Sequence, residues 1–227
     1  MISKLPRWVE VGGFCMACIA GATNAVGVLA FEHYAVSHLT GTSTLLGISL
    51  AELSLTESVH LLGIIFSFVL GAVAAGAIVG NVALQLGRQY SFALLLESLL
   101  LLGALAALTR DLTLGHYLAS AACGLQNGMV STYSGAVVRT THVTGLFTDL
   151  GTMMGAALRG HQPNMRQMVL YLLLIAGFIL GGSIAAILFT SVQLYALLFP
   201  ASGAAALAVV YWTFRLQTGA PGRSTGD

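Results

Sequence analysis

The chain has 227 residues, of which 57% are hydrophobic and only 7% are charged, and its mean hydropathy is +0.88. Soluble domains carry about 25% charged residues, so nine Lys and Arg with eight Asp and Glu cannot coat a water-soluble globule, and a net charge of +1 gives no basic surface for nucleic acid. The composition therefore excludes a soluble enzyme, a disordered chain and a nucleic-acid-binding protein. It predicts an all-α, polytopic helical membrane protein with one transmembrane domain over residues 1–227.

Six apolar runs are long enough to cross a bilayer, since a spanning helix needs about 20 residues. In chain order they are 8–31, 60–82, 91–108, 114–138, 168–189 and 194–214. The first run follows a basic start like that of a signal peptide, but its length favours a first membrane helix. The runs 38–50 and 142–158 are shorter and more polar, and hydropathy leaves open whether they cross the bilayer or enter and turn back. A flexible C-terminal tail is expected over 215–227.

The distribution of Lys and Arg predicts the orientation, because these residues favour cytoplasmic loops. With the N-terminus inside, a crossing by all eight runs places seven Lys and Arg inside and two outside. If the two short runs do not cross, eight lie inside and only Arg110 lies outside. Both arrangements place both termini in the cytoplasm, and the second fits the rule slightly better.

The two halves of the chain share a pair of motifs, which indicates an internal repeat. Gly-Ala-Thr-Asn at 21–24 and His-Leu-Thr-Gly at 38–41 correspond to Gly-Leu-Gln-Asn at 124–127 and His-Val-Thr-Gly at 142–145. We therefore predict two homologous repeats, about 8–109 and 114–214. Three crossings per repeat would make them inverted and four would make them parallel; the charge count favours the inverted form.

The shared motifs suggest a binding site at the repeat interface. A Thr-Gly at the start of each short helix leaves backbone N–H groups that can bind an anionic group, although the threonines could instead only cap the helices. Asn and Gln inside a bilayer need polar partners, so they either hold helices together or line a cavity. The substrate-binding candidates are Asn24, Thr40, Gly41, Gln126, Asn127, Thr144 and Gly145.

Four titratable residues are candidates for ion coupling or a proton relay. Glu97 and Asp149 interrupt apolar runs, where a charge costs about 2.5–3.5 kcal/mol, and His38 and His142 begin the two short runs. Each candidate also has a structural alternative. Glu97 could be a buried structural carboxyl, and Asp149 could cap a helix or pair with Arg139. The two histidines could recur only because the segment was duplicated. No catalytic or metal-ligand spacing is present, so we expect no enzyme activity, no cofactor and no metal.

The motifs in the second half resemble those of the YoaK family of bacterial inner-membrane proteins. The resemblance rests on Gly-Leu-Gln-Asn-Gly-Met-Val at 124–130 and Val-Arg-Thr-Thr-His-Val-Thr-Gly at 138–145, with Ser91–Glu97 in support. It covers about 8–214. Family members often carry an acidic residue at the position of Asn24. They also often have Thr-Gly-Asn where this chain has Thr-Gly-Thr at 40–42 and Thr-Gly-Leu at 144–146. The resemblance implies a multi-pass protein of the inner membrane that is described as a transporter without an established substrate.

Together these features predict a transporter for a small molecule or an ion that works by alternating access at the repeat interface. The alternatives are a channel and a membrane scaffold or accessory protein, while an intramembrane enzyme is disfavoured. The lipid bilayer is an expected partner and a homodimer is an open option. Several Gly-x-x-x-Gly pairs, at 76/80, 124/128, 151/155 and 177/181, are expected to pack helices within the chain first and to form a dimer face second.

Overall fold

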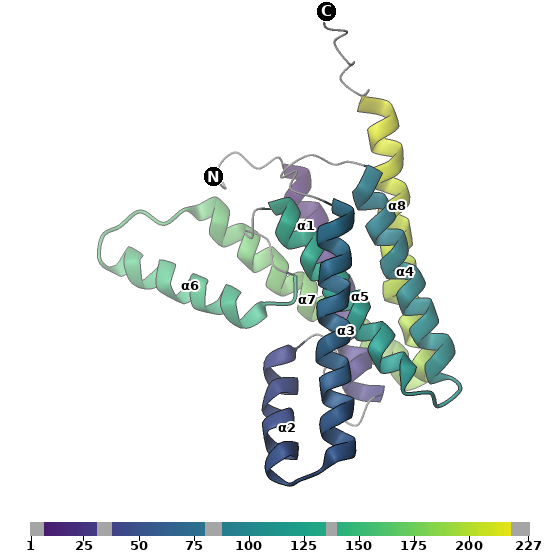
Figure 1. The fold of residues 1–227 in the computed structure, drawn as a ribbon. Coiled ribbons are helices and arrows are strands. Elements are labelled where there is room, and N and C mark those ends of the chain that lie inside the picture. The colour runs from purple at the N-terminus through teal and green to yellow at the C-terminus, as the bar shows by residue number, and fades with distance from the viewer. Residues whose placement is uncertain (1–6, 31–37, 80–87, 135–139, 219–227) are drawn as a thin grey trace, which may run out of the picture.

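The computed structural model describes residues 7–30, 38–79, 88–134 and 140–218, and every regular element in these ranges is helical (Figure 1). This confirms the predicted all-α class. In chain order the elements are α1 (Arg7–Ala30), α2 (Leu39–Ala51), α3 (Leu55–Val79), α4 (Arg88–Leu108), α5 (Leu114–Ser134), α6 (Val143–Leu158), α7 (Met165–Val192), the short 3-10 helix η2 (Gln193–Leu197) and α8 (Leu198–Thr218).

Most helix bounds lie within a few residues of the predicted runs. The largest difference is at α3, which begins at Leu55 instead of residue 60, so that Glu57 lies in its first turn and not in a loop. The last helix continues to Thr218, into the expected tail, and residues 219–227 lie outside the described part of the chain.

Four stretches are long and apolar enough to cross a membrane: Glu10–Ala30, Leu55–Val79, Arg88–Leu108 and Met165–Thr213, the last of which contains α7, η2 and α8. The helix α5 is not among them, because polar residues such as His116, Gln126 and Asn127 interrupt its apolar sequence. These four stretches support the prediction of a helical membrane protein.

The helices α3 and α5 pack along each other as a parallel pair. The Ser120 hydroxyl of α5 donates a hydrogen bond of 2.8 Å to the Ile64 carbonyl of α3, and one turn further along both helices Gly124 lies against Phe68. Because the contacts advance in the same direction on both helices, the pair is parallel.

The helices α1 and α7 form a second parallel pair. Gly177 of α7 lies against Phe14 of α1, and one turn later Gly181 lies against Cys18. Both helix pairs therefore join residues that are more than 50 positions apart in the chain.

The helices α4 and α8 run antiparallel to each other and complete the bundle. The Arg88 guanidinium at the start of α4 lies 5.3 Å above the Trp212 ring near the end of α8. At the other end, the start of α5 returns along α4, where Gly115 contacts Leu108. Since α8 also runs opposite to α1, with Gly203 against Ile19, α1, α4 and α7 point one way and α3, α5 and α8 the other.

Glycines allow the close approach within both parallel pairs. An added Cβ would overlap a backbone carbonyl of the partner helix at each of five positions: Gly21 against Phe178, Gly177 against Phe14, Gly181 against Cys18, Gly124 against Phe68 and Gly71 against Ala121. The Gly-x-x-x-Gly pairs at 124/128 and 177/181 thus pack helices within the chain, whereas Gly76, Gly151 and Gly155 meet no neighbouring atom.

The short helices α2 and α6 begin in the middle of the bundle and run outwards from it (Figure 1). The His38 ring before α2 lies 6.0 Å from the Phe178 ring, near the middle of α7. The α2 helix then leads into a hairpin with α3, in which the hydroxyls of Ser49 and Ser58 are hydrogen-bonded at 2.9 Å. At 13 and 16 residues the helices are only about 20 and 24 Å long, which is less than the ~30 Å of bilayer hydrocarbon.

Candidate functional site

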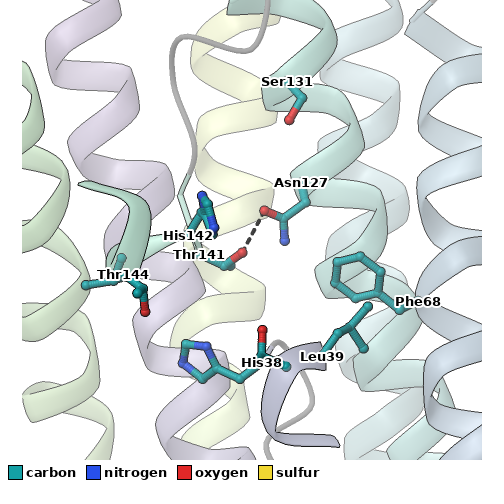
Figure 2. A pocket seen from close by; sticks show the side chains of 10 residues that line it. His38, Leu39, Phe68, Asn127, Ser131, Thr141, His142 and Thr144 are labelled. Carbon is teal, nitrogen blue, oxygen red and sulfur yellow. Dashed lines mark hydrogen bonds between the residues drawn. The ribbon is translucent and has the colours of Figure 1, made fainter. Parts of the chain in front are cut away.

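A cavity of about 500 Å³ lies where the beginnings of α2 and α6 meet α3 and α5. Figure 2 shows side chains from all four helices around it. The residues that line it are His38, Leu39, Thr40, Phe68, Asn127, Ser131, Thr141, His142, Val143 and Thr144. The cavity therefore brings together segments that lie about a hundred positions apart in the chain.

Five of the predicted site residues line this cavity: His38, Thr40, Asn127, His142 and Thr144. They come from both halves of the chain, and Figure 2 shows His38, His142 and Thr144 across the cavity from Phe68 and Asn127.

The two predicted glycines lie next to these segments but do not line the cavity. An added Cβ at Gly145 would overlap the ring of His142, so this glycine makes room for the histidine. The equivalent Gly41 has no neighbouring atom within 4 Å. The surroundings of the two glycines therefore differ, although each glycine directly follows a threonine that lines the cavity.

The first turns of α2 and α6 have the same construction. His38 and His142 are the N-cap residues, and their carbonyl groups accept the amides of Thr42 and Leu146 at 3.2 Å in each case. Neither histidine side chain caps its helix. The N–H groups of a first helical turn have no acceptor within the helix, and they carry partial positive charge. Two such ends therefore face the same cavity.

Burial lowers the pKa of the His38 imidazole below its ordinary value. A neutral imidazole has one N–H donor and one nitrogen acceptor. At neutral pH, His38 can thus offer either kind of hydrogen bond to a molecule in the cavity.

Consecutive threonines hold the start of α6 against α5. Thr140 donates to the Gln126 Oε1 at 3.4 Å, and Thr141 donates to the Asn127 Oδ1 at 2.7 Å (Figure 2). These two hydrogen bonds form a ladder that holds Thr140 and Thr141 beside Gln126 and Asn127 of α5. It therefore places His142 at the cavity in the middle of the bundle and not at the end of α5.

The buried amides have different environments. Gln126, which is 1% exposed, also donates from Nε2 to the Met16 carbonyl at 3.1 Å, so it connects α5 to α1 and lies outside the cavity lining. Asn127 lines the cavity and donates to the Cys123 carbonyl of its own helix at 2.9 Å. Asn24 is buried on α1 and does not line the cavity.

The two acidic candidates are also separate from the cavity lining. Glu97 on α4 is 2% exposed, and its Oε2 has no hydrogen-bond partner within the described ranges. Asp149 on α6 is exposed, and its suggested partner Arg139 is outside those ranges. Within the same ranges, no three His, Cys, Asp or Glu side chains are grouped so that they could hold a metal ion.

Five residues line the cavity but were not predicted as site residues from the sequence: Leu39, Phe68, Ser131, Thr141 and Val143. Thr141 had a detectable signal, since it directly precedes the His-x-Thr-Gly motif and lies 14 residues after Asn127. Ser131 lies one helical turn beyond Asn127, which could also have been noticed. Phe68 reaches the cavity only because α3 packs on α5, and no local sequence pattern predicts this position.

The chain belongs to the family DUF1275, described as a protein of unknown function, whose family model matches residues 12–210. The predicted membership of an uncharacterised family is thereby confirmed at this level, while the YoaK name stays a prediction. No curated protein and no solved structure matches the chain.

Proposed function

We propose that this member of the DUF1275 family is a transporter of the bacterial inner membrane that moves a small polar solute by alternating access. One observation carries the proposal: the beginnings of two short helices, one from each half of the chain, meet at a cavity in the middle of an apolar helical bundle. Helix ends at membrane depth are tolerated where they are buried in protein or line a water-filled cavity.

The cavity has the size and chemistry of a small-molecule site. Its volume of about 500 Å³ lies within the ~300–1,000 Å³ of typical ligand pockets. His38, Asn127 and Ser131 supply side-chain donors and acceptors, and Phe68 supplies an apolar wall. The site therefore suits a solute that has both polar groups and an apolar part.

An inverted internal repeat supports alternating access, since many transporters are built from two such repeats around a central site. In the proposed repeats, about 8–109 and 114–214, α1 corresponds to α5 and α3 to α7. The contact of Gly21 with Phe178 then corresponds to that of Gly124 with Phe68. The equivalent helices α1 and α5 point in opposite directions, which is the relation expected of inverted repeats.

The positions of the arginines support an orientation with both termini in the cytoplasm. The ends of the helices place five at one end of the bundle: Arg7, Arg88, Arg159, Arg166 and Arg215. Arg110 lies at the opposite end, in the turn between α4 and α5. We assign the arginine-rich end to the cytoplasm by the positive-inside rule.

This orientation can be tested with single cysteines in exposed turns and a maleimide that does not cross membranes. Leu112→Cys, between α4 and α5, should be labelled in intact spheroplasts. His161→Cys, between α6 and α7, should be labelled only after the membrane is opened. The opposite pattern would reverse the orientation, and equal labelling of both in sealed spheroplasts would contradict an odd number of crossings between them.

Transport is tested first through binding and then through flux. A bound solute raises the thermal stability of the purified protein, so a thermal-shift screen of metabolites selects candidates for uptake into proteoliposomes. Ser131→Phe should fill the cavity and abolish both effects, while Ser202→Phe, on an exposed part of α8, should leave them unchanged. If no solute binds, and none is taken up with or without a proton gradient, the proposal is wrong; a non-saturating conductance would instead indicate a channel.

Glu97 is our candidate for ion coupling, because a carboxyl group in the bilayer is costly unless it has a function. Its complete burial on α4, next to α5, places it beside a helix that lines the cavity. With a transported solute in hand, Glu97→Gln should abolish the dependence of uptake on the proton gradient and retain solute exchange. Unchanged dependence would assign Glu97 a structural role.

A further inference from the structure

A second polar cluster lies between α3 and α5, near the first turns of both helices. The His60 Nε2 on α3 is 3.0 Å from the His116 Nδ1 on α5, and the ring centroids are 5.0 Å apart. The other nitrogen of His60, Nδ1, is 3.1 Å from the Tyr117 hydroxyl. The cluster thus uses both nitrogens of His60 to connect one helix to the other.

The hydrogen-bond geometry determines how many protons the two imidazoles can share. With both rings neutral, His60 donates from one nitrogen and accepts at the other, and His116 and Tyr117 supply the matching groups. One added proton makes His60 a donor at both nitrogens, which the His116 nitrogen and the Tyr117 oxygen can both accept. A second proton would set an N–H group against an N–H group at 3.0 Å, with two cations in contact.

Several charged residues lie at the same end of the bundle as the two histidines. Glu57 lies one turn before His60 on α3. The other charged groups described at this end of the bundle are Glu52, Arg110 and Asp111, which are exposed in the turns after α2 and α4. Because no third metal-ligating side chain joins the two histidines in the described ranges, a proton fits the cluster better than a metal ion.

We propose that His60 and His116 form a proton-binding site that takes up one proton without disturbing the contact between α3 and α5, and that a second proton separates the two helices. The site is distinct from the cavity, whose lining it does not join. Proton uptake itself does not depend on the proposed transport function. The effect of helix separation on transport does depend on it, because Phe68 and Asn127 on the same two helices line the cavity and would move with them.

The proton site is tested by NMR titration of the full chain in nanodiscs, with ¹⁵N-labelled histidine and no added solute. In the wild type, His60 and His116 should titrate together in two steps, as coupled groups do. In His116→Gln, His60 should return to a single step, while His161→Gln, at an exposed turn position, should leave the two-step curve unchanged. Independent single-step curves for both residues in the wild type, or no titration of either between pH 4 and 9, would overturn the proposal.

A second variant covers the case in which His116→Gln does not fold. Tyr117→Phe keeps both imidazoles and removes only the phenol hydroxyl, so the two-step titration should persist. A change to two independent curves in Tyr117→Phe would show that the imidazoles are not directly coupled, and it would overturn the proposal.

The separation of the helices is measured by spin labels at Val59→Cys on α3 and Leu114→Cys on α5, which are both exposed. The native cysteines are replaced in this background. The distance between the labels should lengthen at acid pH, and it should stay constant with pH when His60→Gln is added. An unchanged distance across the titration would refute the helix separation. Because neither measurement uses a solute, a failure here leaves the transport proposal standing, and a failure of transport leaves the titration standing.

Discussion

Replacing one buried glycine in each parallel helix pair should destabilise the protein by a similar amount. Gly71 on α3 and Gly181 on α7 are two of the glycines that lie directly against backbone carbonyl groups of the partner helix. An added methyl group would lie against the carbonyl groups of Ala121 and Cys18, far inside the 3.4 Å at which ordinary contacts begin. Because those atoms are helix backbone, they cannot rotate away as a side chain could, and the two helices must separate.

The expected size of the effect follows from this overlap. Overpacking of a well-filled interior costs about 1–3 kcal/mol, and 1 kcal/mol changes the melting temperature by about 2–4 °C in a chain of this size. Gly71→Ala and Gly181→Ala should therefore each lower the melting temperature by roughly 2–12 °C. The decisive quantity is the difference in melting temperature from a control variant on the same helix.

Gly76→Ala is the matched control, because it lies on the same helix as Gly71 and its added methyl group would meet no atom within 4 Å. Alanine is favoured over glycine in a helix by about 1 kcal/mol, so this variant should be at least as stable as the wild type. The melting temperature is measured by intrinsic fluorescence in one detergent for all variants. If Gly71→Ala and Gly181→Ala have the same melting temperature as Gly76→Ala, the parallel pairs are not packed through these glycines.

Three further substitutions test the polar contacts. Thr141→Val removes the hydroxyl that donates a 2.7 Å hydrogen bond to the Asn127 Oδ1. It should lower the free energy of unfolding by about 1–3 kcal/mol and weaken solute binding. Unchanged binding would show that this hydrogen bond does not position the site. Gln126→Leu removes both of its contacts, to Met16 and Thr140, and should destabilise by about 1–3 kcal/mol; because Gln126 does not line the cavity, it should weaken solute binding less than Thr141→Val does. Arg166→Gln breaks the partly exposed 2.9 Å ion pair with Glu10. The free energy of unfolding should fall by less than about 1 kcal/mol, and this difference should vanish at high salt. A larger loss of stability that does not depend on salt would contradict a partly exposed pair.

Helix positions were predictable from the sequence because the signal for them is local. An apolar run of about 20 residues has few alternatives to a helix, and the observed helices follow the predicted runs closely. The start of α3 was misplaced because hydropathy undervalues Glu57 and Ser58. Ser58 is buried in the hairpin through its hydrogen bond to Ser49, and that contact depends on the tertiary structure.

The candidate site was predicted in part, and the difference follows from the kind of evidence. The motif that recurs in both halves pointed to His38, Thr40, His142 and Thr144, all of which line the cavity. Polarity alone pointed to Gln126 as well, but polarity does not distinguish an amide that faces a cavity from one that binds the backbone of a neighbouring helix. Only the packing of α1 against α5 decides this, because it puts the Met16 carbonyl within reach of the Gln126 amide.

The lengths of the two short helices explain why the cavity lies in the middle of the bundle. In the proposed inner-membrane transporter, α2 and α6 are too short, at about 20 and 24 Å, to cross ~30 Å of hydrocarbon, and one end of each lies at membrane depth. That end carries backbone N–H groups without helical acceptors, which lipid cannot satisfy. The bundle must therefore bury them or offer them water, and the pairing of Thr140 and Thr141 with α5 leads the start of α6 to the place where α2 also begins. A polar cavity there is the arrangement that satisfies both ends at once, which is why we place the solute site at this point and not elsewhere in the bundle.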